Sequence, residues 1–149
     1  GKVEAIEHEV ATLRPEELAS FRAWFAAFDA DAWDRQIADD AAAGRLDVLA
    51  EQALASAAEG KTTAFESPRL TCILGHLHDL PEEVRRVADR CFALLKSDPA
   101  HPSLHCKRIG RFWSVRAGLH HRALGIAIEG GVLWFWIGSH AQYDKLIRD

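Results

Sequence analysis

The sequence lacks the features of several common protein classes. No run of 18 apolar residues occurs, so we expect no membrane span. The first eight residues lack the apolar core of a signal peptide. The three cysteines, Cys72, Cys91 and Cys106, are odd in number and show no CxxC spacing, which favours reduced thiols. A cytoplasmic protein is the expectation.

Motifs for metals, nucleotides and activated nucleophiles are missing as well. His76 and His78, and the adjacent His120 and His121, have spacings that do not turn both imidazoles toward one ion. No Gly-rich phosphate loop occurs. Cys72 and Cys91 fall on expected helix faces, where a place in the core is the favoured interpretation. The sequence therefore predicts no metal site and no cofactor.

Charge is present but unevenly distributed. Residues 1–66 hold 6 Lys/Arg and 14 Asp/Glu, a net charge of −8, whereas residues 67–149 hold 12 and 8, a net charge of +4. Seven of the eight histidines also lie in the second part. An acidic half before a basic half indicates masking within the molecule or an anionic partner for the basic half. Two solvated surfaces of different charge are the plain alternative.

Residues 1–60 show helical periodicity. Apolar residues recur every three or four positions within 3–13, and a second helix is expected to start at Pro15. A restart is expected at Asp29–Asp31, and Gly44 and Gly60 stand where helix C-caps would. The apolar stripes are narrow, so these three or four helices are suited to packing on a partner or on the second half.

After a polar connection at 61–66, the pattern changes twice. Apolar spacing predicts a helical hairpin, whose helices begin near Pro68 and Pro81 and which ends at Asp98–Pro99. Alternation then predicts strands at 112–117, 120–128 and 132–137, with turns at Ala117–Gly118 and Gly130–Gly131, and a short closing helix near Tyr143. Trp134 and Trp136 are expected in the core. The expected class is α+β: a helical segment, then a helical hairpin packed on an antiparallel sheet of three to four strands with a short C-terminal helix.

Cationic and proton-transferring side chains surround the expected sheet. Such a surface is suited to RNA phosphate: a His or Lys would deprotonate a 2′-hydroxyl, an Arg would stabilise the phosphorane, and a second His or Tyr would protonate the leaving oxygen. For each residue alone, a solvated charge or a structural histidine is the alternative. The candidates are His101, His105, Lys107, Arg108, Arg111, Arg116, His120, His121, Arg122, His140, Tyr143 and Lys145.

Longer phrases of the chain resemble a known family. The second half, residues 67–149, resembles the RelE/ParE superfamily of toxins from type II toxin–antitoxin systems. The first half, residues 1–60, resembles the small helical antitoxins that accompany them. The phrases in the second half are Leu80-Pro81-Glu82-Glu83-Val84, Asp98-Pro99-Ala100-His101-Pro102-Ser103-Leu104-His105, Gly110-Arg111-Phe112-Trp113-Ser114-Val115-Arg116 and Trp136-Ile137-Gly138-Ser139-His140-Ala141-Gln142-Tyr143-Asp144-Lys145-Leu146. Those in the first half include Pro15-Glu16-Glu17-Leu18-Ala19, Phe21-Arg22-Ala23-Trp24-Phe25 and Ala43-Gly44-Arg45-Leu46-Asp47.

The resemblance implies an antitoxin joined to its toxin through the linker 61–66. RNA-cleaving members of the superfamily are metal-independent endoribonucleases (mRNA interferases) that act on mRNA in the ribosome, so the fused toxin domain is expected to be held inhibited. It also implies roles. His101, His105 and Lys107 would be basic catalytic residues, Arg116 or Arg122 would stabilise phosphate, and His140 and Tyr143 would be the C-terminal acid or base. Arg108, Arg111, His120 and Lys145 would bind RNA.

The chain also departs from the family's pattern. Members of the family usually have an aromatic residue where this chain has Cys106, and often have one where it has Thr71. Tyr is frequent in the family at the position of His121. Weakened or lost activity is therefore an alternative, as is a non-catalytic module that is directed at gyrase or has become regulatory. Masking within one chain and masking between two protomers of a homodimer both remain open. Operator DNA is a third partner to consider, although a charge of −8 on the first half disfavours phosphate contact.

Overall fold

The computed structural model describes residues 1–59, 81–129 and 131–148. Backbone contacts divide the chain into two compact units, residues 1–36 and residues 37–149. The expected linker 61–66, the first helix of the expected hairpin, Cys72 and the His76/His78 pair lie outside the described residues. Among the residues that are described, no helix is both long and apolar enough to cross a membrane.

The N-terminal unit consists of helix α1 (Lys2–Ala11) and most of helix α2 (Pro15–Ala42). The expected start at Pro15 is confirmed, with Glu16 and Glu17 in the first turn. The expected restart at Asp29–Asp31 is wrong, because α2 runs through it without a break. Neither Gly nor Pro occurs there, and the flanking alanines favour helix. Acidic residues alone are therefore not a start signal.

Gly44 ends α2 as a C-terminal cap, which the sequence predicted. Its φ of +79° is left-handed. The amide of Gly44 donates to the carbonyl of Ala41 (3.2 Å) and the amide of Arg45 donates to that of Asp40 (2.9 Å). This pair of bonds is the Schellman motif, which satisfies carbonyls that the helix end would leave free. The chain then turns into helix α3 (Asp47–Ala58).

The second unit contains a four-stranded antiparallel sheet in the order β1-β2-β3-β4. The strands are β1 (Lys107–Ile109), β2 (Phe112–Ala117), β3 (His121–Ile128) and β4 (Gly131–Ser139). The prediction is confirmed for β2 and starts one residue early for β3. For β4 it starts one residue late and stops two residues early. The coarse α+β class and the antiparallel sheet are thus confirmed.

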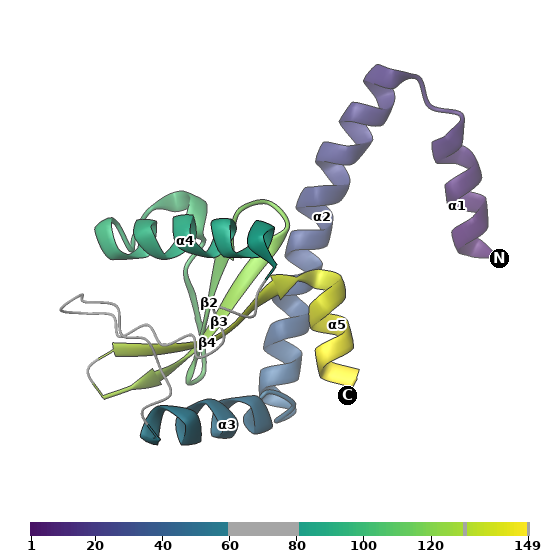
Figure 1. Cartoon of the computed structure of the whole chain (residues 1–149). Helices are drawn as coiled ribbons and strands as arrows, with labels where there is room; N and C mark the ends of the chain where they lie inside the picture. Colours follow the sequence, from purple (N-terminus) through teal and green to yellow (C-terminus); the bar gives the residue numbers. More distant parts are fainter. Residues whose placement is uncertain (60–80, 130, 149) are drawn as a thin grey trace. The chain divides into compact units, whose positions relative to one another are not determined.

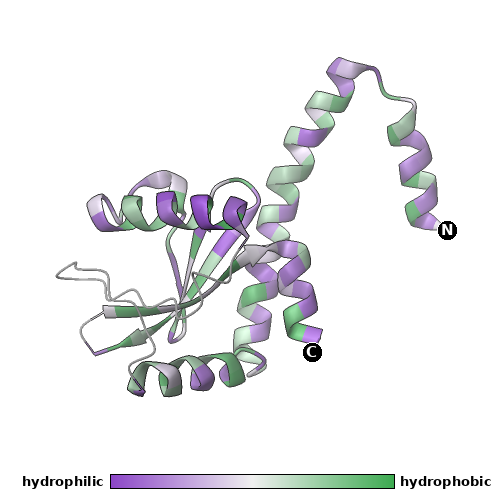
Figure 2. Cartoon of the chain, in the orientation of Figure 1, coloured by the Kyte–Doolittle hydropathy of each residue, from purple (hydrophilic) through white to green (hydrophobic). Residues whose placement is uncertain are grey.

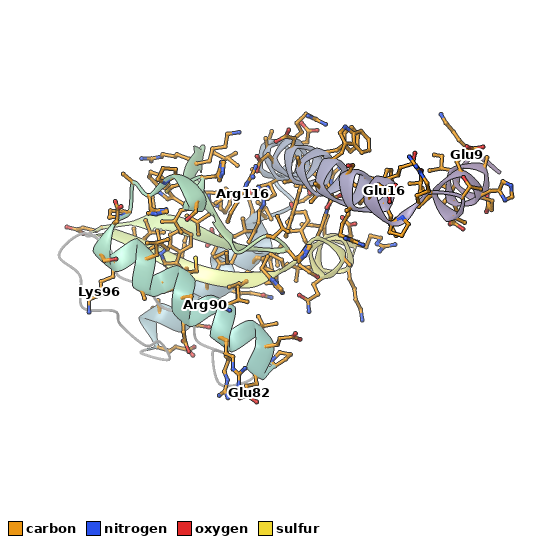
Figure 3. The ribbon with its side chains drawn as sticks, turned by 90° about the horizontal axis from the view of Figure 1, so that it is seen from above. Glu9, Glu16, Glu82, Arg90, Lys96 and Arg116 are labelled. Atoms are coloured by element: carbon orange, nitrogen blue, oxygen red, sulfur yellow. The ribbon has the colours of Figure 1, made fainter. Side chains whose placement is uncertain are left out.

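Helix α4 (Glu82–Ser97) covers one face of the sheet (Figure 1). It begins directly after Pro81, as its Pro-Glu-Glu sequence predicted. Its buried residues pack with alternate residues of the strands, while charged side chains such as Glu82 and Lys96 mark its two ends (Figure 3). Trp134 is confirmed as core at 1% exposure and lies 6.0 Å from the Phe92 ring, whereas Trp136 is only partly buried. The core of this face contains Val84, Ala88, Cys91, Phe92, Leu95, Leu104, Val115, Ala117, Ala123, Val132, Trp134 and Ile137.

Two short elements complete the unit. A 3₁₀ turn, η2 (Pro102–Leu104), replaces part of the loop expected at 101–106 and inserts Leu104 into the core. Helix α5 (His140–Arg148) begins directly where β4 ends. The amide of Ser139 donates to the side chain of Gln142 (2.7 Å), and the amide of Gln142 donates to the Ser139 hydroxyl (3.2 Å). This reciprocal capping box fixes where α5 starts.

Candidate functional site

The sheet face opposite α4 carries most of the predicted site, and it is not open to solvent. Successive strand residues point to opposite faces, so Ser114, Arg122 and Leu124 lie on this second face. All three are buried. Helix α3 packs against β4 (Figure 1), and Ile37 and Leu46 of the helical segment are fully buried. Residues 37–58 therefore cover the face that the sequence predicted to bind phosphate.

Strand register brings the candidate arginines together. Arg116 on β2 is directly opposite Arg122 on β3, and Arg122 is in turn opposite Gly138 on β4. Lys107 on β1 pairs with Ser114, two residues before Arg116 on the same face. Arg122 is only 2% exposed. Guanidinium groups side by side on neighbouring strands are suited to a phosphate or carboxylate group.

The start of α5 adds His140 and Tyr143 to the same end of the sheet. The capping box holds this helix at the end of β4, next to the Arg122–Gly138 pair. The Tyr143 ring packs edge-on against Trp136 at 5.8 Å, and Tyr143 is completely buried. His140 lies 3.7 Å from Asp144 one turn further along. Of the predicted catalytic residues, Lys107, Arg116, Arg122, His140 and Tyr143 thus occupy one end of the sheet.

An acidic residue of the first half occupies this end of the sheet. The Tyr143 hydroxyl donates a 2.6 Å hydrogen bond to Oδ2 of Asp40, across 103 residues of sequence. The other carboxylate oxygen, Oδ1, accepts a 2.8 Å bond from Arg45. Burial raises the pKa of Tyr143 above its ordinary range, and the hydrogen bond to Asp40 and the negative charges of Asp40 and Asp144 raise it further. Tyr143 is therefore held neutral and already committed as a donor.

A second acidic contact lies toward the β1–β2 turn. Arg111 approaches Asp47 at 3.0 Å and Glu51 at 3.6 Å, both on α3. Its guanidinium also lies 5.3 Å from the centre of the Phe112 ring. These ionic partners are about half exposed, so the contact is a surface one. Arg111, predicted to bind RNA, is thus paired with carboxylates of the first half.

The remaining candidates do not join this cluster as one site. His101 accepts a bond from the Ser103 amide (3.1 Å) and caps η2. His105 is exposed with a left-handed φ of 41°. Arg108 stacks on Trp113 at 5.6 Å from the ring centre. The other two, His120 in the β2–β3 turn and Lys145 on α5, are exposed.

Three other titratable side chains with shifted pKa values, His121, Cys91 and Cys106, do not belong to this cluster. Burial lowers the pKa of His121, as does the charge of His120, while Glu83 of α4 raises it. Burial raises the pKa of Cys91 to about 12, which makes this thiol inert at neutral pH. Partial desolvation by neighbouring atoms also raises the pKa of Cys106, although much of its surface is exposed. Within the part of the chain that the structure describes, no three His, Cys, Asp or Glu are grouped to hold a metal ion.

Sequence reasoning missed the residues that contact the candidates. Asp40 and Arg45 were two of many charges in the first half, and neither stood out. The predicted cap at Gly44 was the available signal, because a Schellman motif brings the residues four before and one after the glycine together. A second signal was the Ser139-x-x-Gln142 pattern, which marks a capping box and fixes the position of Tyr143.

Comparison with protein-family models, with curated proteins and with solved structures finds no match for this chain.

Proposed function

We propose that the chain is a self-neutralised toxin, in which residues 67–149 form a RelE-like, metal-independent ribonuclease domain that acidic residues of the first half inhibit. The hydrogen bond from Tyr143 to Asp40 is the observation that carries this proposal. It joins a predicted proton donor of the second half to a buried carboxylate of the first. The charge split of −8 and +4 favours the same arrangement.

The chemistry follows from the groups at one end of the sheet. Lys107 would accept the proton of an RNA 2′-hydroxyl, and Arg116 and Arg122 would stabilise the negative charge of the phosphorane. Tyr143 or His140 would donate a proton to the leaving 5′-oxygen. Asp40 opposes this chemistry twice, because it accepts the hydrogen bond that the Tyr143 hydroxyl would otherwise donate to the leaving oxygen and places a negative charge where phosphate would bind.

The experiment compares the full chain with residues 67–149 in a ribosome-dependent mRNA cleavage assay, with cleavage mapped at the RNA ends. We expect cleavage by residues 67–149, none by the full chain, and suppression when residues 1–66 are added back as a separate polypeptide. A Tyr143→Phe variant of residues 67–149 tests the donor. Absence of cleavage by a folded segment, with its fold checked by circular dichroism, would contradict the proposal.

A matched pair of variants separates catalysis from binding. Residues 67–149 are expressed as two variants. His140→Ala removes a proposed acid, whereas Lys145→Ala removes an exposed charge on the same helix. Catalytic toxicity predicts that growth arrest is reduced more by the first change than by the second. Growth arrest that persists in both variants, with mRNA intact, supports the non-catalytic alternative.

A further inference from the structure

Trp136 on β4 is the tryptophan that departs from the expected core position. It is only partly buried, whereas Trp134 on the same strand is 1% exposed and packs in the core under α4. Trp136 pairs directly with Leu124 of β3, which lies on the face opposite α4. Directly paired residues of antiparallel strands point to the same face of a sheet. Trp136 therefore lies on the face that residues 37–58 cover.

A β-bulge turns the two tryptophans to opposite faces. Side chains two residues apart on a regular strand share a face. Here, however, Gly125 of β3 pairs with Trp134 and the adjacent Leu124 pairs with Trp136, so β4 has one extra residue at this point. Bulges of this kind re-aim a side chain and are common beside active sites. The aromatic-rich sequence of β4 alone did not reveal this reversal.

Strand register places Trp136 beside the candidate arginines. The next residue of β4 on this face, Gly138, is paired with Arg122, and Arg122 is paired with Arg116 on β2. Hydrophilic residues stand among hydrophobic ones along these strands (Figure 2). Arg122 and Trp136 are thus diagonal neighbours across two strands, a separation that long and aromatic side chains can span.

Gly138 gives the indole ring of Trp136 its place next to Arg122. A Cβ atom on Gly138 would lie 2.5 Å from Cζ2 and 2.9 Å from Cη2 of Trp136. The ring therefore occupies the space that a side chain opposite Arg122 would fill. The Tyr143 ring also packs against it, with the ring centres 5.8 Å apart. Trp136 thus adjoins both the proposed phosphate-binding arginines and a proposed proton donor.

We propose that Trp136 is a stacking platform for a nucleobase of single-stranded RNA, next to the phosphate that Arg116 and Arg122 would hold. This inference rests on the proposed function and deepens it. An aromatic ring beside cationic groups binds an unstacked base and its backbone together, whereas the bases of a duplex are already stacked on each other. Because residues 37–58 cover this face, they would exclude the base as well as the phosphate.

The test uses the full chain with its cover released by substitution. Leu46→Asp places a charge at a fully buried position of the cover, and Asp40→Ala is a milder second background that removes the acceptor of the Tyr143 hydroxyl. Circular dichroism selects the background that keeps the helix and strand content of wild type. Two labelled probes are compared by fluorescence anisotropy: a short 2′-O-methyl RNA, which lacks the reacting hydroxyl, and an abasic strand with the same sugar–phosphate backbone.

The ratio of the two dissociation constants measures the contribution of the bases. In the released chain we expect the RNA to bind at least about tenfold more tightly than the abasic strand. Trp136→Ala should remove most of this ratio, and Trp136→Phe should retain most of it. Trp113→Ala is the matched control, because Trp113 is a partly buried tryptophan on the α4 face, and it should leave the ratio unchanged. Arg116→Gln should weaken the binding of both probes alike.

The outcomes separate this inference from the proposed function. A released chain that binds both probes with a ratio unaffected by Trp136→Ala would overturn the stacking role and leave the ribonuclease proposal standing. An equal loss of the ratio in Trp113→Ala would overturn it too, because the effect would not be local to this face. A folded, released chain that binds neither probe would contradict the proposed function together with this inference.

Discussion

At the scale of single residues, the buried Asp40 carboxylate is stabilised by two donors. It is 4% exposed and accepts bonds from the Tyr143 hydroxyl at 2.6 Å and from Arg45 at 2.8 Å. A buried charge is costly unless it is paired and hydrogen-bonded. Removal of one partner would leave the remaining group without its hydrogen bond, which would lower the free energy of unfolding by about 1–3 kcal/mol. The three side chains therefore act together in holding residues 37–58 on the sheet.

Titration of Tyr143 tests this arrangement directly, because the chain has a single tyrosine. Its pKa is raised above the ordinary value of 10.0 in the folded state. Above about pH 10 the unfolded chain loses the phenol proton while the folded chain retains it, so stability falls as pH rises there. We expect phenolate absorbance of native protein to appear only with unfolding at high pH. Asp40→Ala should move the pH at which phenolate absorbance appears down toward pH 10. Ionisation of Tyr143 near pH 10 in the native wild-type protein would contradict the hydrogen bond to Asp40.

The sequence revealed residue types better than residue partners. Trp134 and Cys91 were predicted to be core because they lie on apolar faces, and both are buried. Asp40 was not identified, because its partner lies 103 residues away and no local pattern encodes such a contact. Arg122 was expected to face phosphate on an open sheet but is 2% exposed. Its exposure depends on how residues 37–58 dock on the sheet, which the sequence does not specify.

At the scale of elements, the turn at Gly44 places both acidic contacts. Its Schellman motif bonds Arg45 to Asp40 near the end of α2, and the Asp47 amide at the start of α3 then donates to the Gly44 carbonyl (3.2 Å). Secondary structure in this region was readable where glycine or proline marks an end, as at Pro15, Pro81 and Gly44. It was misread at Asp29–Asp31, where only charge suggested a boundary. Local backbone chemistry is thus a stronger signal than charge.

Substitution of Gly44 is expected to loosen the acidic contacts. Gly44→Ala must keep a left-handed φ of +79° and places Cβ 3.3 Å from Asp47, so we expect a loss of about 1–2 kcal/mol in unfolding free energy. Gly44→Asn should lose less, since Asn tolerates this conformation. Gly110→Ala is the control: its φ is +62° and, among the described residues beyond its chain neighbours, no atom lies within 4 Å of the added Cβ.

Urea unfolding measures the stability of these variants, and the Tyr143 titration reports on the contact with Asp40. Both alanine variants should be destabilised, but only Gly44→Ala should lower the apparent pKa of Tyr143. Equal effects of the two substitutions on that titration would show that the turn does not position Asp40.

At the scale of the whole molecule, apolar contact outweighs charge in holding the cover on the sheet. The charge split predicted an electrostatic mask. The contacts of Arg111 with Asp47 and Glu51 are about half exposed, and exposed ion pairs contribute roughly 0–1 kcal/mol each. Ile37, Leu46 and Ala50 are fully buried. Charge thus gives the cover its orientation, whereas burial gives it stability.

Two matched variants decide between these contributions. Leu46→Ala removes a side chain with no exposed surface and should lower the unfolding free energy by about 2–5 kcal/mol at any ionic strength. Asp47→Asn/Glu51→Gln removes the ionic contacts and should lower it by less than about 2 kcal/mol, an effect that high salt abolishes. Urea unfolding at low and high salt, followed by tryptophan fluorescence, gives both values. A larger loss from the ionic double variant than from Leu46→Ala would mean that the mask is electrostatic after all, because burial of Leu46 would then contribute less than screened surface charges.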